Sequence, residues 1–137
     1  SMAAHAYEFQ TEQEAYSFGK LNMPTDYAAV TAACSMISKE KYNLVKGMDE
    51  HLANNFNDVE LNIRLLKQGF YNVYLGNVKM YHYESKTRGT DKTKAQIKRT
   101  NEEREYVLDK WHDIVFDDPF YNPCFSKNEP YVLEKKQ

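Results

Sequence analysis

The sequence lacks three features, and each absence excludes a class of protein. None of its apolar runs approaches the roughly 20 residues that a membrane-spanning helix needs. Its formal net charge of -2 creates no field that would attract nucleic acid, so we expect no nucleic-acid partner. Its two cysteines, Cys34 and Cys124, lie far apart, and the N-terminus lacks the basic and apolar regions of a secretion signal. We therefore expect free thiols and a cytoplasmic protein.

What the chain does contain is typical of one globular domain. Its 137 residues are enough to form a single core. The hydrophobic share of 42% and the charged share of 28% are ordinary for a soluble domain. Tyrosine is abundant, with 11 residues. Tyrosines suit half-buried surfaces and grooves for polar ligands, although they also fill ordinary cores.

The most regular stretch predicts a helix over residues 57–68. Asn57 is a candidate N-cap, and Glu60 stands three residues later, as in a capping box. Gly69 can end the helix in the left-handed conformation. The apolar stripe of this helix consists of Val59, Leu61, Ile63, Leu65 and Leu66. Asp58 lies in the first turn, where a helix dipole stabilises a carboxylate. It is therefore either a favourable first-turn residue or a catalytic group.

The rest of the pattern alternates strands and helices, which indicates an α/β protein. Residues 27–37 are small and apolar, and they predict a buried strand that is broken near Thr31. β-branched and aromatic residues predict two further strands, over 70–75 and 78–83. We expect these strands to form a small mixed β-sheet with helices on its flanks.

Two more helices complete the expected fold. Ser38 is a candidate N-cap for a short helix that ends at Gly47. A long helix is expected over 93–115, and Pro119 lies just beyond its end. The inner positions expected in this long helix are Ile97, Tyr106, Leu108, Trp111 and Val115. An extended tail follows it to the C-terminus.

Six short blocks occur in a fixed order along the chain. They are Val30-Thr31-Ala32-Ala33-Cys34, Lys46-Gly47-Met48-Asp49-Glu50, Phe56-Asn57-Asp58-Val59-Glu60-Leu61-x-x-Arg64-Leu65, Gly69-Phe70, His82-x-Glu84-Ser85-x-x-Arg88-Gly89 and Asp118-Pro119-x-Tyr121-Asn122-Pro123. This series resembles the C-terminal half of family 2 glycosyltransferases with a GT-A (Rossmann-like) fold, of the bacterial type that builds cell-surface polysaccharides or decorates glycoproteins. The resemblance implies a lead-in segment at 1–26, the acceptor-side half of a GT-A domain at 27–92, and a helix and tail packed on it at 93–137.

The resemblance implies an enzyme that transfers a sugar from a nucleotide-sugar donor to a glycan, glycoprotein or lipid-linked acceptor. Asp58 matches the general base that deprotonates the acceptor hydroxyl, whereas Asn57 departs from the more common Glu. His82 matches a late metal ligand, and Mg²⁺ or Mn²⁺ would neutralise the departing diphosphate. The expected location is the cytoplasm or the inner face of the cell membrane.

Five further residues are candidates for substrate binding. Thr31 would lie along the floor of the acceptor side, and Asp49 and Glu50 would contact the acceptor. Arg88 would steady the diphosphate, and Glu84 would accept a hydrogen bond from His82 and so support it as a ligand. Four of these five have a simpler interpretation, namely a polar turn for Asp49 and Glu50, and charges that face water for Glu84 and Arg88. The simpler interpretation of His82 is a packed or hydrogen-bonded histidine.

One part of such enzymes is absent from the sequence, the N-terminal half that binds the sugar nucleotide and ends in an Asp-x-Asp motif. The nearest triplet, Asp58-Val59-Glu60, opens a predicted helix instead of closing a strand. We therefore expect the isolated chain to transfer no sugar, and its incomplete sheet to promote a homodimer through an exposed edge. The alternatives are a non-catalytic module that binds glycans or proteins, and a small helical interaction domain.

Overall fold

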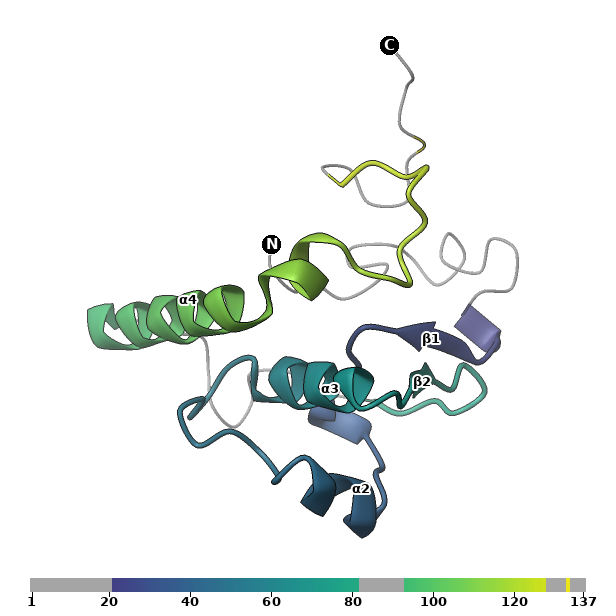
Figure 1. Cartoon of the computed structure of the whole chain (residues 1–137), viewed down its shortest axis with the longest axis horizontal. Helices are drawn as coiled ribbons and strands as arrows, with labels where there is room; N and C mark the ends of the chain where they lie inside the picture. Colours follow the sequence, from purple (N-terminus) through teal and green to yellow (C-terminus); the bar gives the residue numbers. More distant parts are fainter. Residues whose placement is uncertain (1–20, 82–92, 128–132, 134–137) are drawn as a thin grey trace.

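The structure is a computed structural model that describes residues 21–81, 93–127 and 133, and its fold is mixed α/β (Figure 1). The predicted fold class is therefore confirmed. The elements, in chain order, are strand β1 (Thr25–Tyr27), the 3₁₀ helix η2 (Ala32–Cys34), helix α2 (Lys39–Leu44), helix α3 (Asn57–Lys67), strand β2 (Asn72–Tyr74) and helix α4 (Lys94–Phe116).

The described sheet consists of two antiparallel strands. Thr25 of β1 pairs with Tyr74 of β2, and Tyr27 pairs with Asn72. β2 confirms the strand predicted over 70–75, although it is shorter. The strand predicted over 78–83 is wrong where the structure describes it, because residues 78–81 are irregular and exposed. Residues 82 and 83 lie outside the described part.

The buried strand predicted over 27–37 is also wrong. β1 ends at Tyr27, residues 31–36 are exposed, and η2 begins close to the predicted break. Side-chain amides, in place of a neighbouring strand, donate hydrogen bonds to two carbonyl groups of this segment. Nδ2 of Asn62 donates to the carbonyl of Val30 at 3.0 Å, and Nδ2 of Asn72 donates to that of Ala28 at 2.9 Å. The segment is thus fastened to α3 and β2 without extending the sheet.

Helix α3 confirms the most regular prediction, but its first turn differs. Gly69 follows the helix in the left-handed conformation, as expected, with φ 82°. Phe56 is the N-cap, not Asn57, and its own φ of 61° is left-handed. The Oδ1 atom of Asn57 accepts from the backbone N–H of the next residue, Asp58, at 2.8 Å. The predicted capping box is therefore wrong, and the side chain of Glu60 is free to point into the protein.

Helices α2 and α4 begin with side-chain caps. Oγ of Ser38 accepts from the N–H of Lys41 at 3.3 Å, as predicted. Thr93 and Gln96 form a complete capping box at the start of α4. Trp111 has non-helical dihedral angles (φ -131°, ψ 31°), so α4 contains a break near its C-terminal end.

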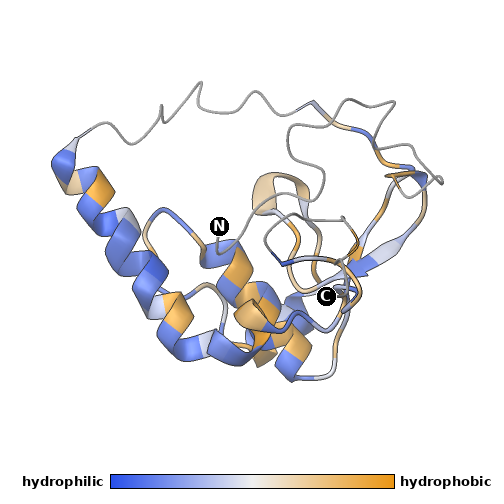
Figure 2. Ribbon diagram, turned by 90° about the horizontal axis from the view of Figure 1, so that it is seen from above, coloured by the Kyte–Doolittle hydropathy of each residue, from blue (hydrophilic) through white to orange (hydrophobic). Residues whose placement is uncertain are grey.

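The inner face of α4 is only partly as predicted. Its buried side chains are Glu103 and Val107, whereas Ile97 is 48% exposed. The N-terminal part of α4 extends beyond the rest of the described protein (Figure 1). The helix is mostly hydrophilic, with short hydrophobic patches (Figure 2). Polar contacts must therefore contribute much of the attachment of α4 to the body.

The apolar core lies mainly between α2 and α3. It consists of Val45, Leu61 and Leu65, with Ile37, Tyr42 and Phe70 packed against it. Ile63 of α3 is buried as well. Among the described residues, no helix is long and apolar enough to cross a membrane.

Polar side chains join α4 to the loop that precedes α3. Oε1 of Glu103 accepts from the N–H of Ala53 at 3.0 Å, and Oε2 accepts from that of Asn55 at 2.9 Å. At the other end, Nζ of Lys67 lies 2.6 Å from the carboxylate of Asp113. The bonds of Glu103 fix the approach of the chain to the start of α3, where Asp58 lies, and the pair of Lys67 and Asp113 joins the end of α3 to α4.

Candidate functional site

Asp58 is half-buried in the first turn of α3, and two backbone groups hold its carboxylate. Oδ1 accepts from the N–H of Val59 at 2.8 Å. Oδ2 accepts from the N–H of Ala32 at 3.0 Å, across 26 positions of sequence. An ionised carboxylate has about four acceptor sites, so both oxygens can still accept from a substrate hydroxyl. The structure therefore brings the predicted Thr31 segment and the predicted base together.

Thr31 begins the 3₁₀ turn beside Asp58. Its Oγ1 atom accepts from the N–H of Ala33 at 3.3 Å, which caps η2. The residue is exposed. Its clearest role in the structure is thus to shape the turn that presents the N–H of Ala32 to Asp58. A contact between Thr31 and a substrate stays a prediction.

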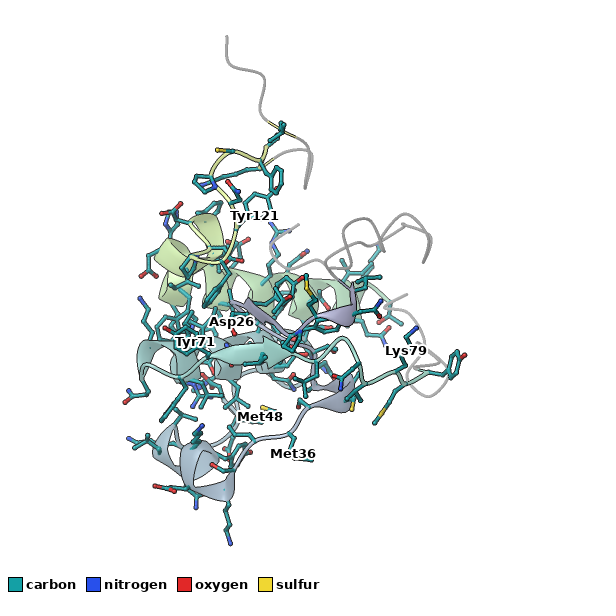
Figure 3. All side chains as sticks on the ribbon, turned by 90° about the vertical axis from the view of Figure 1, so that its right-hand side faces the viewer. Asp26, Met36, Met48, Tyr71, Lys79 and Tyr121 are labelled. Carbon is teal, nitrogen blue, oxygen red and sulfur yellow. The ribbon has the colours of Figure 1, made fainter. Side chains whose placement is uncertain are left out.

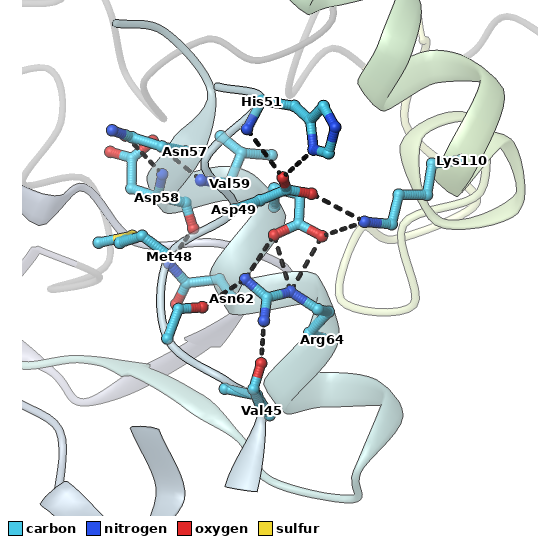
Figure 4. A network of polar contacts seen from close by, with 12 residues as sticks. Val45, Met48, Asp49, His51, Asn57, Asp58, Val59, Asn62, Arg64 and Lys110 are labelled. Atoms are coloured by element: carbon cyan, nitrogen blue, oxygen red, sulfur yellow. Dashed lines mark hydrogen bonds and ion pairs between the residues drawn. The ribbon is translucent and has the colours of Figure 1, made fainter. Parts of the chain in front are cut away.

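Asp49 lies at the centre of a set of hydrogen bonds (Figure 4). Oδ1 accepts from the N–H of His51 at 3.0 Å and lies 2.9 Å from its Nδ1. Oδ2 accepts from the hydroxyl of Tyr106 at 2.8 Å and from Nζ of Lys110 at 3.0 Å. Burial alone would raise the pKa of Asp49, but the hydrogen bonds from Tyr106, His51 and Lys110 outweigh it and hold the pKa well below its usual value. The neighbouring Glu50, by contrast, is exposed.

The lowered pKa of Asp49 predicts that the protein loses stability in acid. The unfolded chain binds this proton more readily than the folded one, so the stabilisation is present above the ordinary value of 3.8 and is lost as the pH falls below it. Urea unfolding between about pH 6 and about pH 2 should therefore show a shallower fall in an Asp49→Asn variant than in the wild type. An Asp109→Asn variant, changed at an exposed carboxylate on α4, serves as the control. Equal slopes in wild type and Asp49→Asn would contradict the assignment.

Glu60 is fully buried and anchors a charged cluster that we define as Asp49, Glu60, Arg64 and Lys110. Nε of Arg64 lies 2.9 Å and 2.7 Å from the two oxygens of Glu60. Nζ of Lys110 lies 2.9 Å from Oε1 of Glu60, and Nε1 of Trp111 donates to the same oxygen at 3.4 Å. Two carboxylates and two cationic side chains are thus brought together, which gives each buried charge a partner of opposite sign.

The same contacts raise the pKa of Lys110. Burial alone would lower it, but the hydrogen bonds to Glu60 and Asp49 outweigh burial and keep the pKa above its usual value. Lys110 is therefore a fixed cation that joins α4 to both α3 and the turn that contains Asp49. Sequence reasoning missed this residue. The spacing of Glu60 and Arg64, which is that of an ion pair on one helix, was a signal for their pair but not for Lys110, which reaches Glu60 only by tertiary contact.

Three predicted site residues, His82, Glu84 and Arg88, lie outside the described residues. Within the described ranges, no three His, Cys, Asp or Glu residues come close enough together to hold a metal ion. The metal site therefore stays a prediction. The last of the six blocks, which contains Tyr121, lies at the opposite end of the molecule from Met36 and α2 (Figure 3).

Comparison with known proteins gives two relatives. No family model and no solved structure matches the chain. The uncharacterized protein y4gI of Sinorhizobium fredii is 33% identical over 134 residues, which are 96% of this chain and 15% of that protein. The O-antigen biosynthesis protein RfbC of Myxococcus xanthus is 29% identical over 106 residues, which are 77% of this chain and 8% of that protein. The chain therefore corresponds to a short part of two much longer proteins, one of them named for O-antigen biosynthesis.

Proposed function

We propose that this chain is the acceptor-side portion of a nucleotide-sugar-dependent glycosyltransferase of family 2, with a GT-A fold, that acts in polysaccharide biosynthesis. The observation that carries the proposal is the carboxylate of Asp58, which the N–H of Ala32 fixes from a distant part of the chain. The ordered sequence blocks and the relative named for O-antigen biosynthesis support it.

The proposed chemistry assigns one step to this chain. The acceptor hydroxyl donates a hydrogen bond to Asp58, and its proton passes to the carboxylate as the oxygen bonds to the sugar carbon. The bond from that carbon to the nucleoside diphosphate breaks, and the diphosphate leaves with the electron pair. Because two N–H groups hold Asp58, its carboxylate keeps one direction during the transfer.

The donor side of the reaction is also part of the proposal. A divalent ion, Mg²⁺ or Mn²⁺, would supply positive charge to the diphosphate when bound, with His82 as a ligand and Arg88 and Glu84 nearby. The described residues alone do not assemble such a site. On the resemblance to family 2 glycosyltransferases, we assign the rest of donor binding to polypeptide beyond this chain, which spans only 15% and 8% of the two longer relatives. A location at the inner face of the membrane and a homodimer through the sheet edge stay predictions.

The test compares the isolated chain with the complete polypeptide that its gene encodes. Both are incubated with Mn²⁺, a panel of UDP- and dTDP-sugars, and methyl glycosides as acceptors. Release of nucleoside diphosphate and formation of a disaccharide are measured. We expect transfer by the complete polypeptide and none by the isolated chain. Transfer by the isolated chain would contradict the assignment of the donor side, and glycan binding without transfer by either protein would favour the non-catalytic module.

A further inference from the structure

We propose that Arg64 is a positioning residue that fixes the turn formed by residues 45–50, so that Glu50 contacts the acceptor while Asp49 fastens the turn to α4. This inference rests on the proposed function and specifies how the acceptor is held. It starts from the guanidinium of Arg64, which lies on the same helix as Asp58.

The guanidinium of Arg64 reaches three groups at once. Nε donates to Glu60, Nη1 donates to the carbonyl of Val45, and Nη2 donates to the carbonyl of Gly47 at 2.6 Å. The side chain is 18% exposed, so water competes little for these bonds. The planar guanidinium group has five N–H donors in a fixed arrangement, so it can make all of these contacts. A lysine ammonium acts as a single point of charge and cannot.

The turn needs such an external support. Lys46 and Gly47 both have left-handed backbones, with φ of 63° and 71°. This conformation is unfavourable for lysine, and it persists where the surrounding structure holds it. At Gly47 a Cβ atom would lie 3.0 Å from the ring of Tyr42, so the turn is also packed closely. The carbonyls on either side of Lys46 are the two that Arg64 binds, so Arg64 holds the turn where its backbone is least favourable.

The two acids of the turn occupy different environments. Both oxygens of Asp49 accept hydrogen bonds from within the protein, including one from Nζ of Lys110 on α4. Glu50 follows it in the chain and is exposed. An exposed carboxylate on a rigid turn can accept hydrogen bonds from sugar hydroxyls without reorganising. Asp49 therefore fixes the turn, and Glu50 is the acid that remains available to a ligand.

The test uses Arg64→Lys, with Arg104→Lys at an exposed arginine of α4 as the matched control. Hydrogen exchange is measured on the amides of residues 45–50 in the complete polypeptide. We expect exchange to accelerate about tenfold in Arg64→Lys and to stay unchanged in Arg104→Lys, because the variant loses bonds to two turn carbonyls. The ratio of transfer to methyl glycosides over donor hydrolysis by water should fall about tenfold in Arg64→Lys, because water needs no positioned turn.

A second variant, Glu50→Gln, distinguishes the contact of Glu50 with the acceptor from the support of the turn. We expect it to lower the ratio of transfer to hydrolysis while amide exchange in the turn stays as in the wild type. An unchanged ratio in Arg64→Lys, or transfer and hydrolysis that fall equally, would overturn the positioning role. If the wild-type polypeptide turns over no donor, the proposed function fails, and unchanged exchange in Arg64→Lys would separately overturn the support of the turn by Arg64.

Discussion

Replacement of Glu60 by glutamine is expected to lower the free energy of unfolding by about 3–5 kcal/mol, because it breaks a buried ion pair on one side only. Glu60 is fully buried and receives donors from Arg64, Lys110 and Trp111. In the variant, an amide nitrogen replaces one of the accepting oxygens, and two cations lose their shared counter-charge. Proteins of this size are stable by only about 5–15 kcal/mol, so the change is large.

Urea unfolding of the chain measures this effect, with Glu102→Gln as the control. Glu102 lies on the exposed face of α4, with Nζ of Lys98 at 3.6 Å, and such pairs contribute about 0–1 kcal/mol. The control should therefore unfold close to the wild type. A Glu60→Gln variant within about 1 kcal/mol of the wild type would show that the charged cluster does not hold the fold together.

The charged cluster also illustrates which features of α3 could be predicted from the sequence and which could not. Periodicity and the glycine that follows it gave the extent of α3 correctly, because these are local properties. The first turn was wrong, since Phe56 takes the left-handed conformation and Glu60 turns inward toward Lys110. That choice depends on α4, whose contact with α3 is tertiary and leaves little trace in the local pattern.

The strand predicted over residues 27–37 failed for a related reason. Small apolar residues fit a buried strand, but the amides of Asn62 and Asn72 bind the carbonyls of Val30 and Ala28. Two polar residues from later elements thus decide the conformation of this segment. The same arrangement brings the backbone of the 31–34 turn to Asp58. The hydrogen bonds that replace the predicted strand therefore also help to form the candidate site.

Replacement of Asp58 by asparagine is expected to reduce the rate of sugar transfer by the complete polypeptide about 100- to 10,000-fold, the usual contribution of a positioned general base. Asparagine has nearly the same shape but cannot take a proton from the acceptor hydroxyl. Donor binding should be little affected, because Asp58 is assigned to the acceptor and not to the donor. Asp109→Asn is the matched control, since it removes an exposed carboxylate from α4.

The Asp58→Asn variant also removes one acceptor of a backbone hydrogen bond, so its fold is checked separately. The introduced amide has a single oxygen for the two N–H groups, of Val59 and Ala32, that the carboxylate accepts from in the wild type. We expect a loss of stability of about 1–3 kcal/mol from the group left without a partner. Urea unfolding of the same variant measures this loss and shows whether the protein assayed is folded.

The most direct test of the account is the single-turnover rate of sugar transfer in Asp58→Asn, measured at saturating donor and acceptor and together with the Kd for the donor. We expect a rate at least about 100-fold below the wild type, with the donor Kd within about twofold and the Asp109→Asn control unchanged. A transfer rate within about tenfold of the wild type would show that Asp58 is not the base.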